Sequence, residues 1–192
     1  MNRSVRGKAL LQLIDRYLRD GAAIEIDGLG SFKLDTSNRV VFEPNGRIRV
    51  FLAYAEEDRA DAKRLYAALQ KAGFEPWMDQ EKLLPGQNWP RAIERAIDLS
   101  EFFIGCFSRR SVVKRGHFQC ELEYALNVAS RVPAEEIFFL PLRFNDCEVP
   151  STISRKVQHV DLFPDWDRGV GELLKAMWHQ TLERNKKTNV KS

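Results

Sequence analysis

The stretch Val50-Phe-Leu-Ala-Tyr-Ala-Glu-Glu-Asp58 joins an apolar run to an acidic turn, and a helical pattern follows over residues 58–72. An apolar run of this length, without polar alternation, is typical of a strand whose two faces are both buried. Asp58 stands where the helix begins, and its side chain can accept hydrogen bonds from the first free N–H groups. The stretch therefore predicts a buried strand, a loop and a capped helix.

Outward from this stretch, short apolar runs alternate with helical patterns along most of the chain. Apolar strands separated by helices are typical of a parallel sheet covered on both faces. The sequence therefore predicts an α/β domain with a flavodoxin-like, doubly wound parallel sheet of about five strands. The expected strands cover residues 48–54, 74–78, 102–107, 137–142 and 156–160, and the expected helices cover residues 58–72, 88–99, 117–130 and 170–178.

The N-terminal part follows a different pattern. Apolar residues at helical spacing within residues 4–19 predict an amphipathic helix, and alternating segments within residues 23–42 predict a small antiparallel meander. We therefore expect an α+β appendage at residues 1–46 and the main domain at residues 47–183. Residues 184–192 are basic and polar, and we expect them to form a disordered tail.

The composition is typical of a globular protein that buries a core, since 44% of the 192 residues are hydrophobic and 30% are charged. No apolar run reaches the length of a membrane span, and the start lacks the apolar segment of a secretory signal. We expect a cytoplasmic protein that does not contact membranes. The three cysteines have no C-x-x-C spacing and are expected to be free thiols, with no metal site.

The net charge of +3 is unevenly distributed. Residues 1–47 carry +2, residues 48–183 carry −3 and residues 184–192 carry +4. The basic excess therefore lies at the ends of the chain and not on the main domain. This distribution gives no reason to expect DNA binding.

Ligands of doubly wound sheets bind beyond the carboxyl ends of the strands, so the loops there are the candidate sites. Residues 83–89 contain a Pro85-Gly turn and apolar residues without periodicity, which is typical of a lid or a contact surface. Lys114 and Arg115 precede a helix, where N–H groups and the helix dipole favour anions such as phosphates. A solvated surface explains the same cationic run, and capping alone explains Asp58.

Glu121 lies one turn into the helix expected over residues 117–130. At about 100° per residue, Phe118 and Leu122 belong to a core-facing stripe, and Glu121 lies roughly 80° from its centre. Glu123 lies roughly 120° away on the other side. We therefore expect Glu121 at the rim of the strand-end cleft and Glu123 in water. A solvated glutamate favoured by the helix dipole is the alternative.

The residues that other functions of this topology require are absent from the sequence. A receiver domain needs an aspartate at the end of the third strand, where this chain has Phe107 and Ser108. No G-x-G-x-x-G follows the first strand, and the sequence has no Walker A loop. His117, His159 and His179 are too scattered for a metal set, and no serine or cysteine stands in a nucleophile elbow.

Several motifs in order make the chain resemble the TIR (Toll/interleukin-1 receptor) family, especially its bacterial members. Residues 50–58 resemble the first TIR box, and residues 73–89 resemble the second box with its BB loop. Residues 93–100, 108–122 and 141–150 continue the match. The resemblance implies the TIR fold over the main domain.

Enzymatic TIR domains cleave the bond between nicotinamide and ribose in NAD+, and the resemblance puts their catalytic glutamate at Glu121. NAD+ is then the substrate, and no cofactor is expected. Nicotinamide leaves as a neutral molecule, so a lone carboxylate that stabilises the oxocarbenium-like transition state suffices. The expected product is ADP-ribose, a cyclic isomer or a conjugate. The resemblance places the substrate-binding residues at Phe51, Ala53, Tyr54, Trp77, Pro85, Trp89, Ser108, Lys114, Arg115 and His117.

Two positions depart from the family pattern. Ala53 replaces the usual serine of the first box, and His117 replaces the aromatic residue usual four positions before the glutamate. The rival function is a non-catalytic adaptor that acts by TIR–TIR association, and the retained Glu121 argues against it. Resemblance to bacterial members also implies antiphage defence or signalling, self-association, and a downstream effector that senses a nucleotide product.

The N-terminal part has a resemblance of its own. Residues 24–32 and 40–44, after the expected helix, resemble the core of the histone-like HU and integration host factor family. Residues 35–38 replace the long DNA-wrapping arm of that family, whose core builds a dimer. Because the arm is absent and the local charge is small, the resemblance implies an assembly module and not a DNA-binding one.

Overall fold

The computed structural model describes residues 16–19, 23–26, 30–34, 38–44, 48–78, 88–112 and 117–189. The chain divides into two compact units, one of residues 48–180 and one of residues 1–47 with residues 181–192. Within the described ranges, no helix is both long and apolar enough to cross a bilayer.

The larger unit is built on a five-stranded sheet in which every pair of neighbouring strands is parallel. The strand order β5-β4-β6-β7-β8 is that of a doubly wound sheet, which confirms the predicted fold class. The strands are β4 (Arg49–Ala53), β5 (Glu75–Trp77), β6 (Phe102–Phe107), β7 (Phe139–Arg143) and β8 (Val160–Asp161), and the helices are η1 (Glu56–Asp58), α2 (Arg59–Lys71), α4 (Trp89–Asp98), α5 (His117–Ala129), α6 (Ser151–Ser154) and α7 (Trp166–Asn189).

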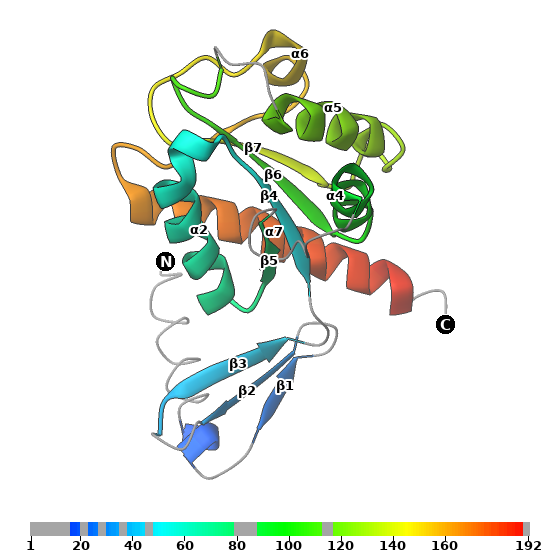
Figure 1. Cartoon of the computed structure of the whole chain (residues 1–192). Helices are drawn as coiled ribbons and strands as arrows, with labels where there is room; N and C mark the ends of the chain where they lie inside the picture. The colour runs from blue at the N-terminus through cyan, green and yellow to red at the C-terminus, as the bar shows by residue number, and fades with distance from the viewer. Residues whose placement is uncertain are drawn as a thin grey trace, which may run out of the picture. The chain divides into compact units, whose positions relative to one another are not determined.

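Different helices cover the two faces of this sheet (Figure 1). Successive residues of a strand point to opposite faces. Val50 and Leu52 of β4 therefore join the core cluster that includes α2 and α7, whereas Phe51 and Ala53 join the cluster that includes α4 and α5. Helices on both faces keep these doubly apolar strands away from water.

The described part of the smaller unit contains the predicted antiparallel meander, which is confirmed: β1 (Ile24–Ile26), β2 (Gly30–Leu34) and β3 (Val40–Pro44). Asn38, between β2 and β3, has a φ of 62°, a left-handed conformation that asparagine adopts more readily than most residues. Of the helix predicted over residues 4–19, residues 16–19 are helical. Residues 4–15 lie outside the described residues.

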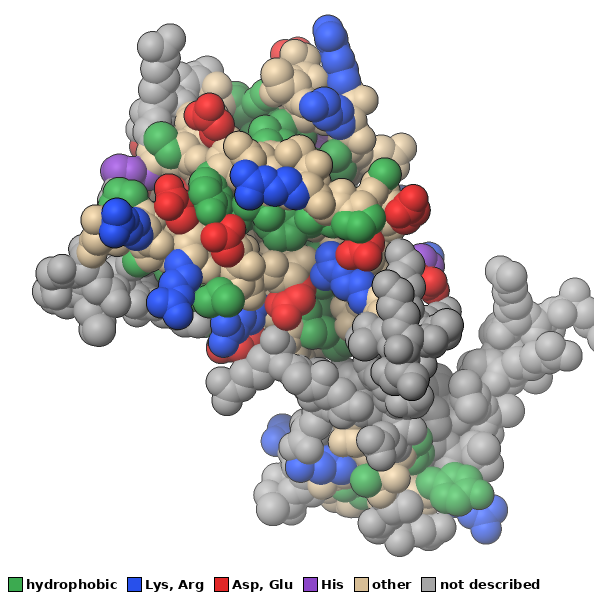
Figure 2. Space-filling model, turned by 90° about the vertical axis from the view of Figure 1, so that its right-hand side faces the viewer, with side chains coloured by type: hydrophobic (Ala, Val, Ile, Leu, Met, Phe, Trp, Pro, Cys, Tyr) green, Lys and Arg blue, Asp and Glu red, His purple; other side chains and the backbone are tan. Residues whose placement is uncertain are grey.

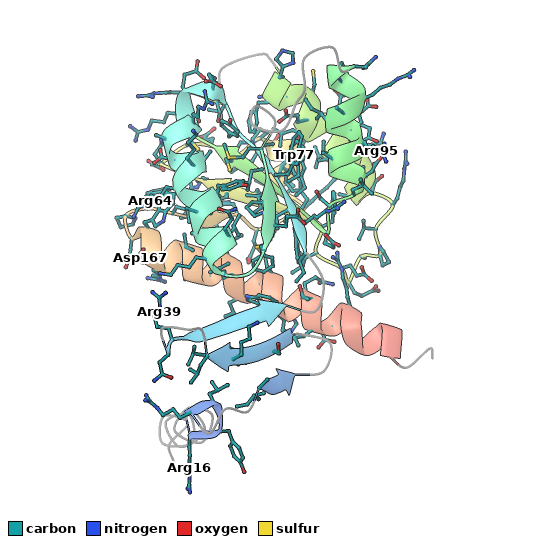
Figure 3. All side chains as sticks on the ribbon, turned by 60° about the horizontal axis from the view of Figure 1, so that its bottom comes forward. Arg16, Arg39, Arg64, Trp77, Arg95 and Asp167 are labelled. Carbon is teal, nitrogen blue, oxygen red and sulfur yellow. The ribbon has the colours of Figure 1, made fainter. Side chains whose placement is uncertain are left out.

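Helix α7 continues to Asn189, whereas the sequence predicts a disordered tail from residue 184. The helix is anchored upstream, where Leu173 is fully buried in the core. Arg64 of α2 also lies 4.0 Å from the ring centroid of Trp166, in the first turn of α7 (Figure 3). Extending an existing helix gains one hydrogen bond for each residue fixed, so the polar segment continues the anchored helix.

Gly169 allows α7 to approach β8 closely. A Cβ atom at this position would lie 2.2 Å from the backbone oxygen of Asp161 and 2.9 Å from the Cα of Leu162. Backbone atoms of a strand cannot give way as the end of a flexible side chain can. Gly171, in the same helix, is exposed, and a Cβ there would meet no atom within 4 Å.

We predict opposite effects on stability for Gly169→Ala and Gly171→Ala. The first pushes α7 away from β8 and destabilises the fold by about 1–3 kcal/mol or more through overpacking. The second stabilises it by about 0.5–1 kcal/mol, because alanine loses less backbone entropy than glycine on folding. Urea unfolding of both variants beside the wild type measures the two changes, and equal changes would contradict the close approach.

Candidate functional site

The carboxyl ends of β4 and β6 lie at the point where the strand order reverses. From β4 the chain goes to β5 on one side of the sheet and then to β6 on the other. Doubly wound sheets bind ligands beyond the strand ends at this switch point. The loops that follow β4 and β6 are therefore the first places to look for a site.

A hydrogen bond between Ser108 and Asp58 joins these two loops. Ser108 Oγ donates to Asp58 Oδ2 at 2.5 Å, and both residues are buried. Ser108 Oγ also accepts from the backbone N–H groups of Arg110 and Ser111, each at 3.1 Å. Since these two bonds use the lone pairs of the hydroxyl, its single hydrogen goes to Asp58.

These contacts change the roles expected for Asp58 and Ser108. Asp58 stands at the N-cap of α2, but its side chain makes no capping hydrogen bond, so the predicted cap is wrong. Burial raises the pKa of the Asp58 carboxyl, while the hydrogen bond from Ser108 and the charge of Arg110 partly oppose the shift. Ser108 is fully buried and its hydroxyl is fully used within the protein, so the substrate contact implied by the family resemblance stays a prediction.

The turn after β6 is bonded to the loops on both of its sides. Arg109 donates from its backbone N–H to Asn145 Oδ1 at 2.9 Å and from Nε to the backbone oxygen of Asp146 at 2.7 Å. Arg110 Nη1 donates to the backbone oxygen of Glu57 at 3.4 Å. The turn therefore connects the loop after β4 with the loop after β7.

An ion pair holds the carboxyl ends of β7 and β8 together. Arg143 donates from Nε and Nη2 to the two carboxylate oxygens of Asp161, at 2.6 and 2.8 Å. Its Nη1 donates to the backbone oxygen of Cys147 at 2.8 Å. The hydrogen bonds from Arg143 hold the pKa of the Asp161 carboxyl below its ordinary value.

Helix α5 carries Glu121 on a buried line of its surface. Glu121 is 5% exposed and lies beside the core residues Phe118 and Leu122, whereas Glu123 is exposed. The predicted orientation of the helix is confirmed. A Cβ atom at Gly105 of β6 would lie 2.9 Å from Leu122 Cδ2, so α5 packs closely on the strand at the level of these residues.

Glu121 lines a cavity of about 280 Å³ between α4 and α5. This volume is at the lower end for small-molecule pockets, so the cavity can hold one part of a ligand. The hydroxyl of Tyr124 donates to Asp98, with 3.0 Å to either carboxylate oxygen, and ties α5 to α4 beside the cavity. The lining residues are Pro90, Ile93, Glu94, Ile97, His117, Cys120, Glu121 and Tyr124.

The start of α4 brings Pro90 to the cavity. Asn88 Oδ1 accepts from the backbone N–H of Arg91 at 3.3 Å, which caps the helix. Pro90 fits the first helical turn because that turn needs no N–H from it. The local sequence thus determines where the α4 wall of the cavity begins.

The structure brings some of the predicted site residues together and separates others. His117 and Glu121 line the same cavity. Phe51 and Ala53 are fully buried in the sheet, on the face that α4 and α5 cover. Tyr54 belongs to the core on the opposite face, with α2 and α7, so it is not placed beside Glu121.

The remaining predicted residues flank this region or lie outside the described residues. Trp77 is half-buried and stacks on Phe51, with ring centroids 4.8 Å apart, on the side of the sheet that α4 covers (Figure 3). Trp89 is the first residue of α4. Pro85, Lys114 and Arg115 lie outside the described residues.

Sequence reasoning misses the α4 wall and the thiol on α5. Ile93 and Ile97 have helical spacing, which predicts an inward-facing line but does not distinguish a packed core from a cavity wall. Cys120 is exposed and lines the cavity. Cys106 and Cys147 are buried, and burial raises the pKa of both thiols. A thiol reagent therefore reaches Cys120 first.

Charged side chains of both signs are interspersed on the face of the molecule shown in Figure 2. A nucleic-acid footprint is a patch of basic residues, and that face shows a mixed surface instead. Among the residues with described placement, no cluster of three His, Cys, Asp or Glu side chains could hold a metal ion.

Comparison with known proteins identifies a family. The TIR domain family matches residues 50–174, which is more than half of the chain. The matched range contains the switch point, α4 and α5. A comparison with curated proteins found no match.

Solved structures agree on the fold at low sequence identity. The TIR domain of the Toll-related receptor TRR-2 from Hydra magnipapillata is 22% identical with a TM-score of 0.52, over 66% of this chain and 97% of that one. The TIR domains of the activated Roq1 resistosome are 19% identical with a TM-score of 0.55, over 68% and 99%. A TIR-STING receptor from C. gigas is 19% identical with a TM-score of 0.56, over 66% of this chain and 38% of the receptor.

We predict that Asp161→Asn destabilises the protein at pH 7 by about 1 kcal/mol, a value discounted for partial exposure. Because the pKa of Asp161 is lower in the folded state, its contribution is present above the unfolded-state value of about 3.9 and is lost as the pH falls through the folded value. The gap in melting temperature between variant and wild type is therefore expected to narrow at acidic pH.

Asp146→Asn is the matched control for this prediction. Asp146 is 73% exposed and lies 3.7 Å from Arg143, so its removal is expected to change the melting temperature little at any pH. Thermal unfolding of the three proteins between pH 7 and about pH 3 makes the comparison. A gap for Asp161→Asn that widens with acid would contradict the assigned role of the ion pair.

Proposed function

The chain belongs to the TIR domain family, and from this premise we propose that it cleaves NAD+ between nicotinamide and ribose, with Glu121 as the essential carboxylate. One observation carries the proposal: Glu121 is almost completely buried, yet it lines a cavity. His117 lines the same cavity, at the position where the family usually has an aromatic ring. A carboxylate that is buried and still borders open space can contact a ligand held in that space.

The chemistry needs a negative charge and no general acid. The bond between ribose C1′ and the pyridinium nitrogen breaks, and its electron pair goes to that nitrogen, so nicotinamide leaves neutral. Positive charge develops on the ribose, and we assign its stabilisation to Glu121. Water then adds to C1′ and loses a proton, which gives ADP-ribose. An atom of the nucleotide that replaces water gives a cyclic product, and another acceptor gives a conjugate.

The cavity suits the nicotinamide end of the substrate. Its volume of about 280 Å³ fits a single ring better than a whole dinucleotide. Ile93 and Ile97 offer apolar surface to the ring, and the planar imidazole of His117 lies on the α5 wall. The phosphates then remain outside the cavity, where the roles of Lys114 and Arg115 stay predictions.

We predict that Glu121→Gln lowers the rate of nicotinamide release from NAD+ by at least about a hundredfold, because an amide keeps the shape but removes the charge. Glu123→Gln makes the same change on the exposed side of α5 and is expected to keep the rate within about twofold of the wild type. Chromatography of the reaction mixture measures nicotinamide and identifies the second product. Equal release from wild type and Glu121→Gln, or none from either, contradicts the proposal and leaves the adaptor function.

We also propose that the smaller unit assembles copies of the chain and so controls when the NAD+ site acts, in antiphage defence or signalling through a nucleotide product. Its described part contains a three-stranded antiparallel meander, and the proposal rests on the resemblance of residues 24–32 and 40–44 to a dimer-building core. Light scattering of the whole protein over a range of concentrations tests assembly, for which we expect dimers or larger species. A monomer at every concentration contradicts it.

A further inference from the structure

We propose that Asp58 and Ser108 are positioning residues that hold Glu121 in its place from a buried network at the switch point. The proposal rests on the proposed function of Glu121. It adds two residues that affect the reaction by fixing the position of Glu121 and do not touch the substrate.

At the switch point, where doubly wound sheets usually bind their ligand, three buried residues are hydrogen-bonded to one another. Asp58, Ser108 and Ser111 are 5%, 0% and 1% exposed. The backbone N–H of Ser108 donates to Ser111 Oγ at 2.7 Å, and Ser111 Oγ donates to the backbone oxygen of Ser108 at 3.1 Å. A ligand between these residues would break buried hydrogen bonds. The network therefore belongs to the framework, whereas Glu121 borders open space.

Packing contacts connect this network to α5. Val112, at the end of the turn, packs against the core cluster that contains Phe118 and Leu122. Phe107, the last residue of β6, contacts the ring of Phe118 edge to face, with centroids 5.6 Å apart. Phe118 and Leu122 lie next to Glu121 on the same helix. A displacement of the turn therefore reaches the part of α5 that carries the carboxylate.

Asp58 is the member of the network that lies outside the turn. The other four hydrogen bonds among Ser108, Arg110 and Ser111 lie within the turn, whereas the bond to Asp58 fixes the turn to the loop after β4. Without that bond, a buried polar group loses its hydrogen-bond partner. A displacement of the turn that lets the group find another partner then lowers the free energy. A misplacement of about 1 Å at a catalytic group can lower a rate about a hundredfold.

The test compares Ser108→Ala and Asp58→Asn in the whole chain. kcat and KM for NAD+ are measured at a temperature well below the melting of every variant. For Ser108→Ala we expect kcat to fall about 10- to 100-fold, with KM within about twofold. The reason is that the Glu121 carboxylate moves while the nicotinamide ring still fits the cavity. For Asp58→Asn we expect a smaller loss of about threefold or more, because the amide oxygen still accepts from Ser108.

Gly169→Ala is the control for lost stability alone. It disturbs the packing of α7 on β8, on the face of the sheet opposite α5, and is expected to keep the wild-type kcat. A merely structural role of Ser108 would give the same result, because a folded protein below its melting temperature keeps its site. A wild-type kcat in folded Ser108→Ala overturns the proposal. If Ser108→Ala does not fold, a wild-type kcat in Asp58→Asn overturns it.

A second readout separates this proposal from the proposed function. Cys120 precedes Glu121 and is exposed, so its rate of alkylation by iodoacetamide reports on this part of α5. We expect Ser108→Ala to raise that rate several-fold and Gly169→Ala to leave it unchanged. If the wild type does not cleave NAD+, the proposed function fails and the Cys120 rate alone decides: a raised rate supports the positioning role, and an unchanged rate overturns it.

Discussion

Strand β6 has no exposed residue, and keeping both of its faces away from water determines the arrangement of the larger unit. Phe102 and Ile104 face the core that includes α2 and α7, while Phe103 and Phe107 face the core that includes α4 and α5. Both helix pairs must therefore pack closely on the sheet. Gly105 has no side chain at the point where α5 crosses β6, so the helix can pack closely on the strand. This close packing determines how deeply Glu121 is buried.

The end of β6 imposes the second constraint. Buried backbone and hydroxyl groups need hydrogen-bond partners, and at Ser108 these come from Asp58 and from the turn itself. The framework and the cavity thus use different residues. Burial of Ser108 excludes it from the surface, whereas Glu121 combines burial with a place in the cavity wall.

The fold could be predicted because its signals are local. The apolar run at 102–107 predicts β6 without error, and helical spacing places Glu121 on the buried side of α5 and Glu123 outside. The role of Asp58 could not be predicted in this way. At a helix start its best local partners are N–H groups, but its actual partner, Ser108, is 50 residues away and only tertiary structure brings them together. The cavity could not be predicted from the sequence either, because the apolar residues of α4 have the same spacing whether they face a packed core or an open cavity.

The most direct test of this account is the rate at which iodoacetamide alkylates Cys120 in Glu121→Gln, with and without NAD+. Cys120 lines the cavity, and we expect the substitution to leave bound NAD+ uncleaved. At NAD+ concentrations that saturate binding by calorimetry, we predict that alkylation of Cys120 slows, while the buried Cys106 and Cys147 stay unmodified in either condition. An unchanged rate at Cys120 under saturation would contradict the placement of nicotinamide between α4 and α5.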